Sequence, residues 1–234
     1  MSLTRRSLLC GGASFLAMAQ ELKPVAPAVD HLLIGVSDLD RGIDWVEKRT
    51  GVRAAVGGVH PGAGTRNALL SLGPGHYLEI IAPDPAQSGV KDDRHLRELA
   101  NPRLITFAIT TQDIDAIAAR ARKARLTVTG PHDGSRRLPS GKVLRWRTLA
   151  IPNDLGSGAV QPVPFFIQWE PDSTHPSGDS PSGCTLESLL LEHEDPPRLN
   201  LVFEALGFDV DVSARSDVRI VATLKSPKGP VELS

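Results

Sequence analysis

The feature that most constrains the fold is a repeated order of predicted elements: one strand, one helix and then three strands. In the first copy, residues 29–37 form an apolar strand and residues 38–51 have helical spacing. Asp38 can cap the start of this helix, and Gly51 can end it. The stretches "VRAAVGGV", "TRNALLSLG" and "HYLEIIAP" then predict three further strands.

The same order recurs twice. The second copy begins with "LITFAITTQDIDAIAARARKARLTVTG", with Asp113 as the helix cap, and continues through "VLRWRTLAIP" and "PVPFFIQWEP". A shorter third copy contains the helix "PPRLNLVFEALGF", with Pro196 or Pro197 in its first turn. We therefore predict one α+β domain over residues 29–234, a cupped mixed sheet built from βαβββ units. The units span about residues 29–83, 104–171 and 184–234.

Two segments connect these units. "KDDRHLRELA" is predicted to be a solvated helix, and residues 171–183, rich in Pro, Ser and Gly, are predicted to be a loop.

Composition excludes some partners. The formal net charge is −1 and only 4% of residues are aromatic, so neither nucleic acid nor an anionic membrane surface is indicated. No apolar run is long enough to span a membrane. A small-molecule ligand is the partner that we expect.

The first residues are predicted to be separate from the fold. Residues 1–19 carry paired arginines, a short apolar run and a small-residue cleavage pattern, which is typical of a twin-arginine export signal. Residues 20–28 would be a linker, and the protein would be periplasmic or secreted; a cytoplasmic protein with an N-terminal extension is the alternative. After cleavage Cys184 would be the one remaining cysteine, so no internal disulfide is expected.

Two polar side chains in the first copy are candidates for chemistry. Glu79 lies mid-strand between apolar residues and shares a face with Tyr77. A buried carboxylate is costly unless a positive group compensates it, so Glu79 either pairs with an arginine such as Arg66 or Arg53 or lies in a pocket. His31 opens a buried strand, where it is either a half-exposed end residue or a ligand or proton-transfer group.

The repeated units and three stretches resemble the glyoxalase-like branch of the vicinal oxygen chelate superfamily. These stretches are "DHLLIGVSDLDRGIDWVEKRTGV", "GTRNALLSLGPGHYLEIIAPDP" and "PFFIQWEPDSTHPS". The resemblance covers about residues 29–234 and implies a cupped sheet around a pocket. It does not specify a substrate, because the fold hosts isomerases, dioxygenases, hydrolases, epimerases and simple binding proteins.

The resemblance also implies a divalent cation such as Zn, Mn, Fe or Ni, since metal-binding members supply ligands from the positions of His31 and Glu79. The second copy departs from this pattern, with Thr106 opposite His31 and Ile167 or Gln168 opposite Glu79. Four residues could replace a missing ligand: Gln168, Glu187, Glu232 and His175. A remnant of two ligands would bind a metal weakly or not at all.

Other side chains are candidates for substrate contact. Arg66 and Asn67 follow a glycine-rich turn and face opposite ways, so one of them is expected to point into the cup and hold a carboxylate or carbonyl. Otherwise Arg66 is a surface residue of a hairpin. Tyr77 and Gln168 are predicted to contact the substrate as well. The remaining histidines in polar contexts are predicted to be solvated: His60, His95, His132 and His193.

Three functions compete at this stage. A metal-dependent lyase or isomerase would act on a small oxygenated (vicinal oxygen) substrate, with Glu79 and His31 as catalytic residues. A metal-free protein of the same fold would bind or sequester a small molecule. A dioxygenase ranks last because it normally requires two histidines and a carboxylate for iron. An odd number of units leaves an open sheet edge, which favours a homodimer.

Overall fold

The computed structural model describes residues 28–137, 141 and 143–234, so the predicted export signal lies outside the described residues. The first unit consists of β1 (Val29–Gly35), α1 (Leu39–Thr50), β2 (Ala55–His60), β3 (Thr65–Ser71) and β4 (Tyr77–Pro83). The second consists of β5 (Arg103–Thr110), α2 (Ile114–Lys123), β6 (Thr129–Arg137), β7 (Val143–Ala150) and β8 (Phe165–Trp169). The third consists of β9 (Thr185–His193), α4 (Pro196–Leu206), β10 (Asp211–Ala214), β11 (Arg219–Ser226) and β12 (Gly229–Leu233).

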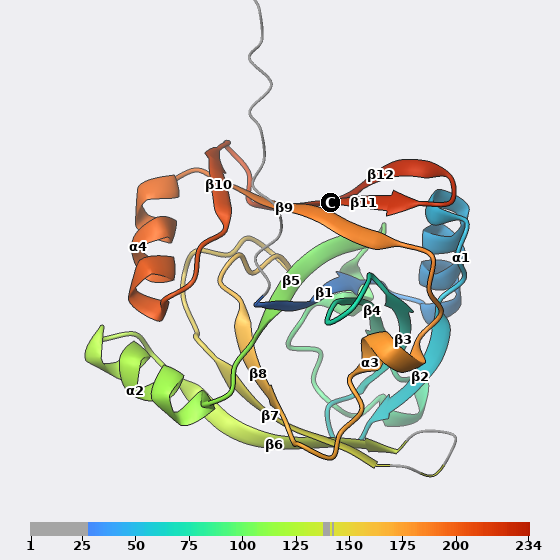
Figure 1. The fold of residues 1–234 in the computed structure, drawn as a ribbon, viewed down its shortest axis with the longest axis horizontal. Coiled ribbons are helices and arrows are strands. Elements are labelled where there is room, and N and C mark those ends of the chain that lie inside the picture. Colours follow the sequence, from blue (N-terminus) through green and yellow to red (C-terminus); the bar gives the residue numbers. More distant parts are fainter. Residues whose placement is uncertain (1–27, 138–140, 142) are drawn as a thin grey trace, which may run out of the picture.

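The first two units form one eight-stranded sheet in the order β2-β3-β4-β1-β5-β8-β7-β6. Within each unit the first strand lies parallel to the last, as β1 does to β4 and β5 to β8, and the two units meet where β1 pairs antiparallel with β5. The sheet curls into a cup, with one unit forming each half (Figure 1). The predicted α+β fold of βαβββ units is confirmed.

The helices begin and end where the sequence predicts. The carboxylate of Asp38 accepts the N–H of Arg41 at 2.9 Å, and Gly51 ends α1 with a φ of 81°, a conformation that glycine adopts without strain. Asp113 caps α2 by accepting the N–H of Ala116 at 2.9 Å.

The core lies on the convex side of the cup. Side chains alternate along β1, so Leu32 and Ile34 enter the core while His31 faces the concave side. The helices α1, α2 and α4 and the sheet of the third unit contribute to the same core. Packing on the convex side leaves the concave side free to form a pocket.

The third unit does not extend the cup. Its strands form a separate four-stranded sheet in the order β10-β9-β11-β12, in which β9 pairs parallel with β10 instead of with β12. This sheet packs against the convex side of the cup, beside α1 and α4 (Figure 1). Glu187 and Glu232 are exposed on it, so the structure places both suggested substitute ligands away from the concave side.

Both connecting segments differ from prediction. "KDDRHLRELA" is not a helix but contains one 3-10 turn, η2 (Leu96–Glu98), because the Asp92 carboxylate accepts the N–H groups of Leu96 and Arg97. Another short turn, η1 (Pro85–Gln87), precedes it. The predicted loop after β8 contains a short helix, α3 (Pro176–Asp179). Among the described residues, no helix is long and apolar enough to cross a membrane.

Candidate functional site

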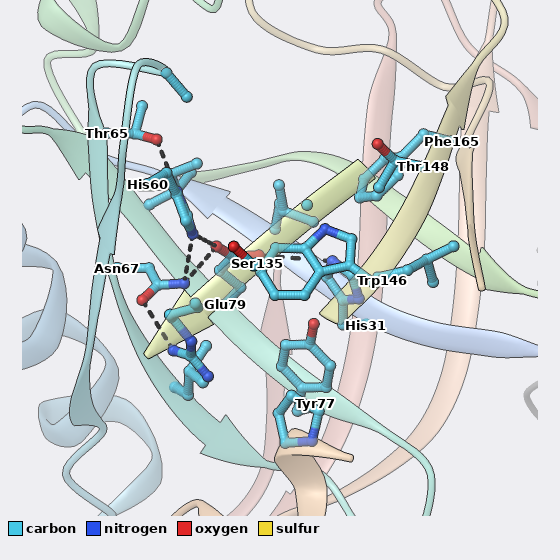
Figure 2. A pocket seen from close by; sticks show the side chains of 18 of the residues that line it. His31, His60, Thr65, Asn67, Tyr77, Glu79, Ser135, Trp146, Thr148 and Phe165 are labelled. Atoms are coloured by element: carbon cyan, nitrogen blue, oxygen red, sulfur yellow. Dashed lines mark hydrogen bonds and ion pairs between the residues drawn. The ribbon is translucent and has the colours of Figure 1, made fainter. Parts of the chain in front are cut away.

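A pocket of about 450 Å³ opens on the concave side of the cup (Figure 2). Side chains from every strand of the eight-stranded sheet other than β5 line the pocket, together with Arg94 from the segment between β4 and β5. Its polar lining residues include His31, His60, Asn67, Tyr77, Glu79, Arg94, Ser135, Arg136 and Thr148, and its aromatic lining residues include Trp146, Phe165 and Trp169. The pocket joins the two halves of the cup.

His31 and Glu79 lie together in this pocket, as predicted. They come from the parallel neighbours β1 and β4, and Nε2 of His31 lies 3.5 Å from Oε2 of Glu79. Both side chains are almost completely buried. The Tyr77 ring stacks on the His31 imidazole at 4.4 Å between centroids, which fixes the plane of the imidazole.

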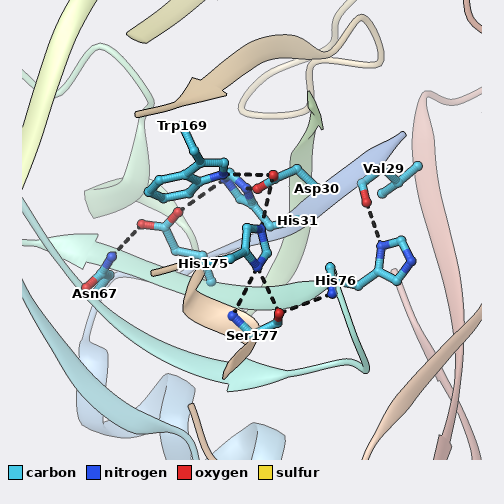
Figure 3. A network of polar contacts seen from close by, with 10 residues as sticks. Val29, Asp30, His31, Asn67, His76, Trp169, His175 and Ser177 are labelled. Carbon is cyan, nitrogen blue, oxygen red and sulfur yellow. Dashed lines mark hydrogen bonds and ion pairs between the residues drawn. The ribbon is translucent and has the colours of Figure 1, made fainter. Parts of the chain in front are cut away.

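Asp30 holds the other side of the His31 ring (Figure 3). Its Oδ1 lies 2.6 Å from Nδ1 of His31, and its Oδ2 accepts the indole N–H of Trp169 at 2.9 Å. Nε2 of His175 lies 3.2 Å from the same Oδ2. Burial alone would raise the pKa of Asp30, but hydrogen bonds from His175 and His31 outweigh burial and hold this pKa far below its usual value. Asp30 is therefore a buried, ionised acceptor.

Glu79 is held by an amide. Nδ2 of Asn67 donates to its Oε1 at 2.7 Å, and Nε2 of His60 lies 3.6 Å from the same oxygen. Burial would raise the pKa of Glu79, but the nearby imidazoles of His60 and His31 and the hydrogen bond from Asn67 lower it. Glu79 is consequently a carboxylate at neutral pH.

The contacts of Asn67 also determine how His60 is protonated. Oδ1 of Asn67 accepts from Arg136 at 3.3 Å, so its amide nitrogen faces Nε2 of His60 at 3.2 Å. Because that amide nitrogen is a donor, Nε2 is an acceptor, and Nδ1 donates to Oγ1 of Thr65 at 2.8 Å. Burial lowers the pKa of His60, which favours this neutral ring.

Comparison with known proteins identifies the family of this chain. The model of the Glyoxalase-like domain family matches residues 29–207, which is most of the chain. The chain belongs to this family. The glyoxalase-like resemblance predicted from the sequence is therefore confirmed. No curated protein matches the chain.

This glyoxalase-like chain is similar to several solved structures. A hypothetical protein from Staphylococcus aureus is 16% identical over 83% of this chain and 89% of its own, with a TM-score of 0.63. A methylmalonyl-CoA epimerase from Streptomyces coelicolor, in complex with 2-nitronate-propionyl-CoA, is 23% identical over 65% of this chain and 99% of its own, with a TM-score of 0.43. A methylmalonyl-CoA epimerase from Mycobacterium tuberculosis is 23% identical over 62% of this chain and 87% of its own, with a TM-score of 0.42.

Several predicted site residues of this glyoxalase-like domain lie elsewhere. Asn67 and Tyr77 line the pocket, but Arg66 does not, because Thr65, Asn67 and Leu69 occupy the concave face of β3. Gln168 also faces away, because Phe165, Ile167 and Trp169 occupy the concave face of β8; its Oε1 accepts the first N–H of α2, that of Ile114. His175 is engaged at both ring nitrogens, by Asp30 and by Ser177, so neither nitrogen is free for a metal.

The sequence analysis overlooked other members of the site. His60 was predicted to be solvated, but it ends β2 inside the pocket. His193 was predicted to be solvated too, but it is buried, and its Nε2 bonds to the carbonyl of Leu155 at 3.0 Å. His132 and His95 are exposed, as expected. Asp30 and Arg136 gave no sequence signal beyond their charge.

The donor set does not fit a resident divalent cation. Asn67 directs an N–H group at both Oε1 of Glu79 and Nε2 of His60, which leaves fewer lone pairs for an ion. Within the described part of the chain, no three side chains of His, Cys, Asp or Glu converge on a point that a metal ion could occupy. We therefore assign no step of the chemistry to a metal.

Proposed function

We propose that the chain is an isomerase or lyase that moves a proton on a small oxygenated substrate, with His31 as the proton-transfer group. The observation that carries this proposal is the position of the His31 ring, with Nδ1 on Asp30 at 2.6 Å and Nε2 facing the pocket beside Glu79. An ionised carboxylate can only accept a hydrogen bond. Asp30 therefore accepts a hydrogen bond from Nδ1–H, and in this tautomer the lone pair of Nε2 faces a ligand in the pocket.

Asp30 and Glu79 lie at different nitrogens of the His31 ring, Asp30 at Nδ1 and Glu79 at Nε2. The lowered pKa of Glu79 makes this carboxylate a weak base, whereas imidazoles as a class exchange protons near neutral pH. When Nε2 of His31 accepts a proton, the resulting imidazolium lies between two carboxylates, Asp30 at Nδ1 and Glu79 at Nε2. Each N–H of this imidazolium then has a carboxylate acceptor nearby.

The reaction that suits this arrangement removes a proton from a carbon next to a carbonyl. The C–H bond breaks, the proton goes to Nε2 of His31, and the electron pair forms an enolate whose charge lies on the carbonyl oxygen. Burial, together with the charges of Asp30 and Glu79, raises the pKa of Tyr77, so its hydroxyl stays protonated and can donate to that oxygen. If the carbon that lost the proton carries a hydroxyl group, that hydroxyl proton moves to the enolate oxygen, His31 returns its proton to the former carbonyl carbon, and the isomer forms. If a leaving group is attached next to that carbon, the electron pair expels it and gives the lyase product.

Deuterium exchange tests this proposal. Dihydroxyacetone, hydroxypyruvate, 2-oxobutyrate and acetoacetate would each be incubated with the protein in D2O, and exchange next to the carbonyl would be followed by proton NMR. We expect exchange with at least one of them and a loss of about 10²-fold or more in His31→Gln. His95→Gln, an exposed histidine, is the matched control and should exchange normally.

A metal-free protein that binds or sequesters a small molecule is the alternative. The hydrogen-bonded chain from Arg136 through Asn67 to Glu79 supports it, since such a preformed polar wall also suits simple binding. Saturable binding with no exchange above the His31→Gln level for any compound would favour this alternative and contradict the enzyme.

A further inference from the structure

We propose that the ligand carries a carboxylate, which Arg136 and Arg94 bind beside Glu79. This inference deepens the proposed function, because it names the chemical class of substrate for the same pocket. It starts from the unused hydrogen-bonding capacity of the two guanidinium groups that line the pocket.

Arg136 is buried in the wall of the pocket. It is only 6% exposed, and the one hydrogen bond that it donates among the described residues is to Oδ1 of Asn67 at 3.3 Å. No carboxylate of the described chain forms an ion pair with it. A guanidinium has five N–H donors, so a buried arginine with one long bond has room for a charged acceptor.

Two glycines of β2 leave space for the Arg136 side chain. Its aliphatic carbons lie against Gly58 and its Nη1 against Gly57, both in β2. A Cβ at position 57 would collide with Arg136 Nη1 and with Asn67 Oδ1. The two glycines thus let a side chain from β6 cross to the opposite edge of the sheet and present its guanidinium inside the cup.

Arg94 supplies the second guanidinium. It lines the pocket from the segment between β4 and β5, and no hydrogen bond or ion pair joins it to another described residue. The other acidic residue in the lining besides Glu79 is Asp133, whose side chain is 94% exposed and lies 3.9 Å from Arg147. Neither pocket arginine therefore forms an ion pair with a carboxylate of the described chain, and only the charge of Glu79 acts on Arg94 from within the pocket.

The geometry favours a carboxylate over a phosphate. Guanidinium groups bind both carboxylates and phosphates, but phosphate sites commonly add the N-terminus of a helix. The helices α1 and α2 lie on the convex side, away from the pocket, and α3, whose Pro176 lines the pocket, has only 4 residues.

A second cavity indicates how the rest of the ligand lies. It has a volume of about 440 Å³ and shares the lining residues Arg94, Thr148 and Phe165 with the first, so the two cavities are adjacent. Its lining includes the apolar residues Ala150, Ile151, Val163, Pro164 and Phe165. An organic acid with its carboxylate at the arginines can extend an apolar part into this second cavity.

Binding of hexanoate, measured by calorimetry and by the fluorescence of Trp146 and Trp169 in the pocket, tests the inference. We expect saturable binding of hexanoate, weaker binding of the neutral match hexanamide, and a loss of about tenfold or more in affinity in Arg136→Gln and in Arg94→Gln. Arg137→Gln, the exposed neighbour of Arg136, is the matched control and should bind normally.

Because Arg136→Gln also breaks a contact across the cup, its fold would be checked by circular dichroism, and Arg94→Gln gives an independent result. Equal binding of hexanoate and hexanamide, or full affinity in both arginine variants, would overturn the inference. Inorganic phosphate that binds more tightly than hexanoate would overturn the carboxylate assignment. The binding test needs no turnover, and we expect His31→Gln to bind hexanoate still. Failure of the carboxylate inference can therefore be distinguished from failure of the proposed function.

Discussion

At the scale of single residues, the site depends on Asp30 and His31, which are neighbours in the sequence. Adjacent residues of a regular strand face opposite sides. The pairing of β1 with β5 shifts register between Val29 and His31, and the Asp30 carboxylate reaches the ring of His31. Sequence alternation could predict that His31 and Glu79 share a face, but a register shift depends on the partner strand and leaves no pattern along the chain itself.

The hydrogen bonds predict three histidine tautomers in the neutral protein. His31 and His60 should carry their proton on Nδ1, facing Asp30 and Thr65, whereas His175 should carry it on Nε2, facing Asp30. Long-range proton–nitrogen NMR correlations of the rings measure this directly. A proton on Nε2 of neutral His31 would remove the lone pair on which the proposed chemistry depends.

Asp30 also predicts how stability depends on pH. The pKa of Asp30 is far lower in the folded chain than in the unfolded chain, so the folded state binds fewer protons. The stabilisation of the folded state by ionised Asp30 is therefore present above about pH 4 and is lost as the pH falls below that value. The difference in free energy of unfolding between wild type and Asp30→Asn should therefore narrow between about pH 7 and pH 3. Urea unfolding at several pH values checks this, and a constant difference would contradict the assignment of Asp30 as an ionised acceptor.

At the scale of elements, the helix caps and the alternation of β1 and β4 followed from local sequence, and they were predicted correctly. Gln168 and His175 were misplaced for reasons that are not local. Which face of β8 is concave depends on its pairing with β5 and β7, and this pairing directs Phe165 and Ile167 inward and Gln168 toward α2. His175 is the N-cap residue of α3, a helix in a segment that was predicted to be a loop.

The two edge strands of the cup, β2 and β6, approach each other where Arg136 crosses to Asn67. Gly57→Ala should push these side chains apart, destabilise the protein by about 1–3 kcal/mol and weaken hexanoate binding. Gly89→Ala is the matched control, because a Cβ there meets nothing within 4 Å. Thermal unfolding and calorimetry check both effects; equal behaviour of the two variants would show that the close approach at Gly57 has no consequence.

At the scale of the whole molecule, the repeat predicted the cup, but it did not predict that the third unit forms its own sheet. The third unit keeps the element order, yet β9 pairs with β10 and β11, and its apolar side joins the core on the convex side of the cup. Element order alone does not determine strand pairing, because it does not specify which edges meet.

The homodimer remains a prediction. The third sheet ends in β10 and β12, and either edge could pair with a second chain. Light scattering at micromolar concentration should give the mass of two chains. A monomer mass would show that these edges are protected within one chain.

The central claim is that His31 transfers a proton in a pocket whose donor set does not hold a divalent cation. The most direct measurement is the rate of deuterium exchange on the best of the four carbonyl compounds after extensive chelation, with the metal content of the same sample determined. We predict an unchanged rate in the metal-free protein and a rate lowered by about 10²-fold or more in His31→Gln. Exchange that disappears on chelation and returns with Zn, Mn, Fe or Ni would contradict the account.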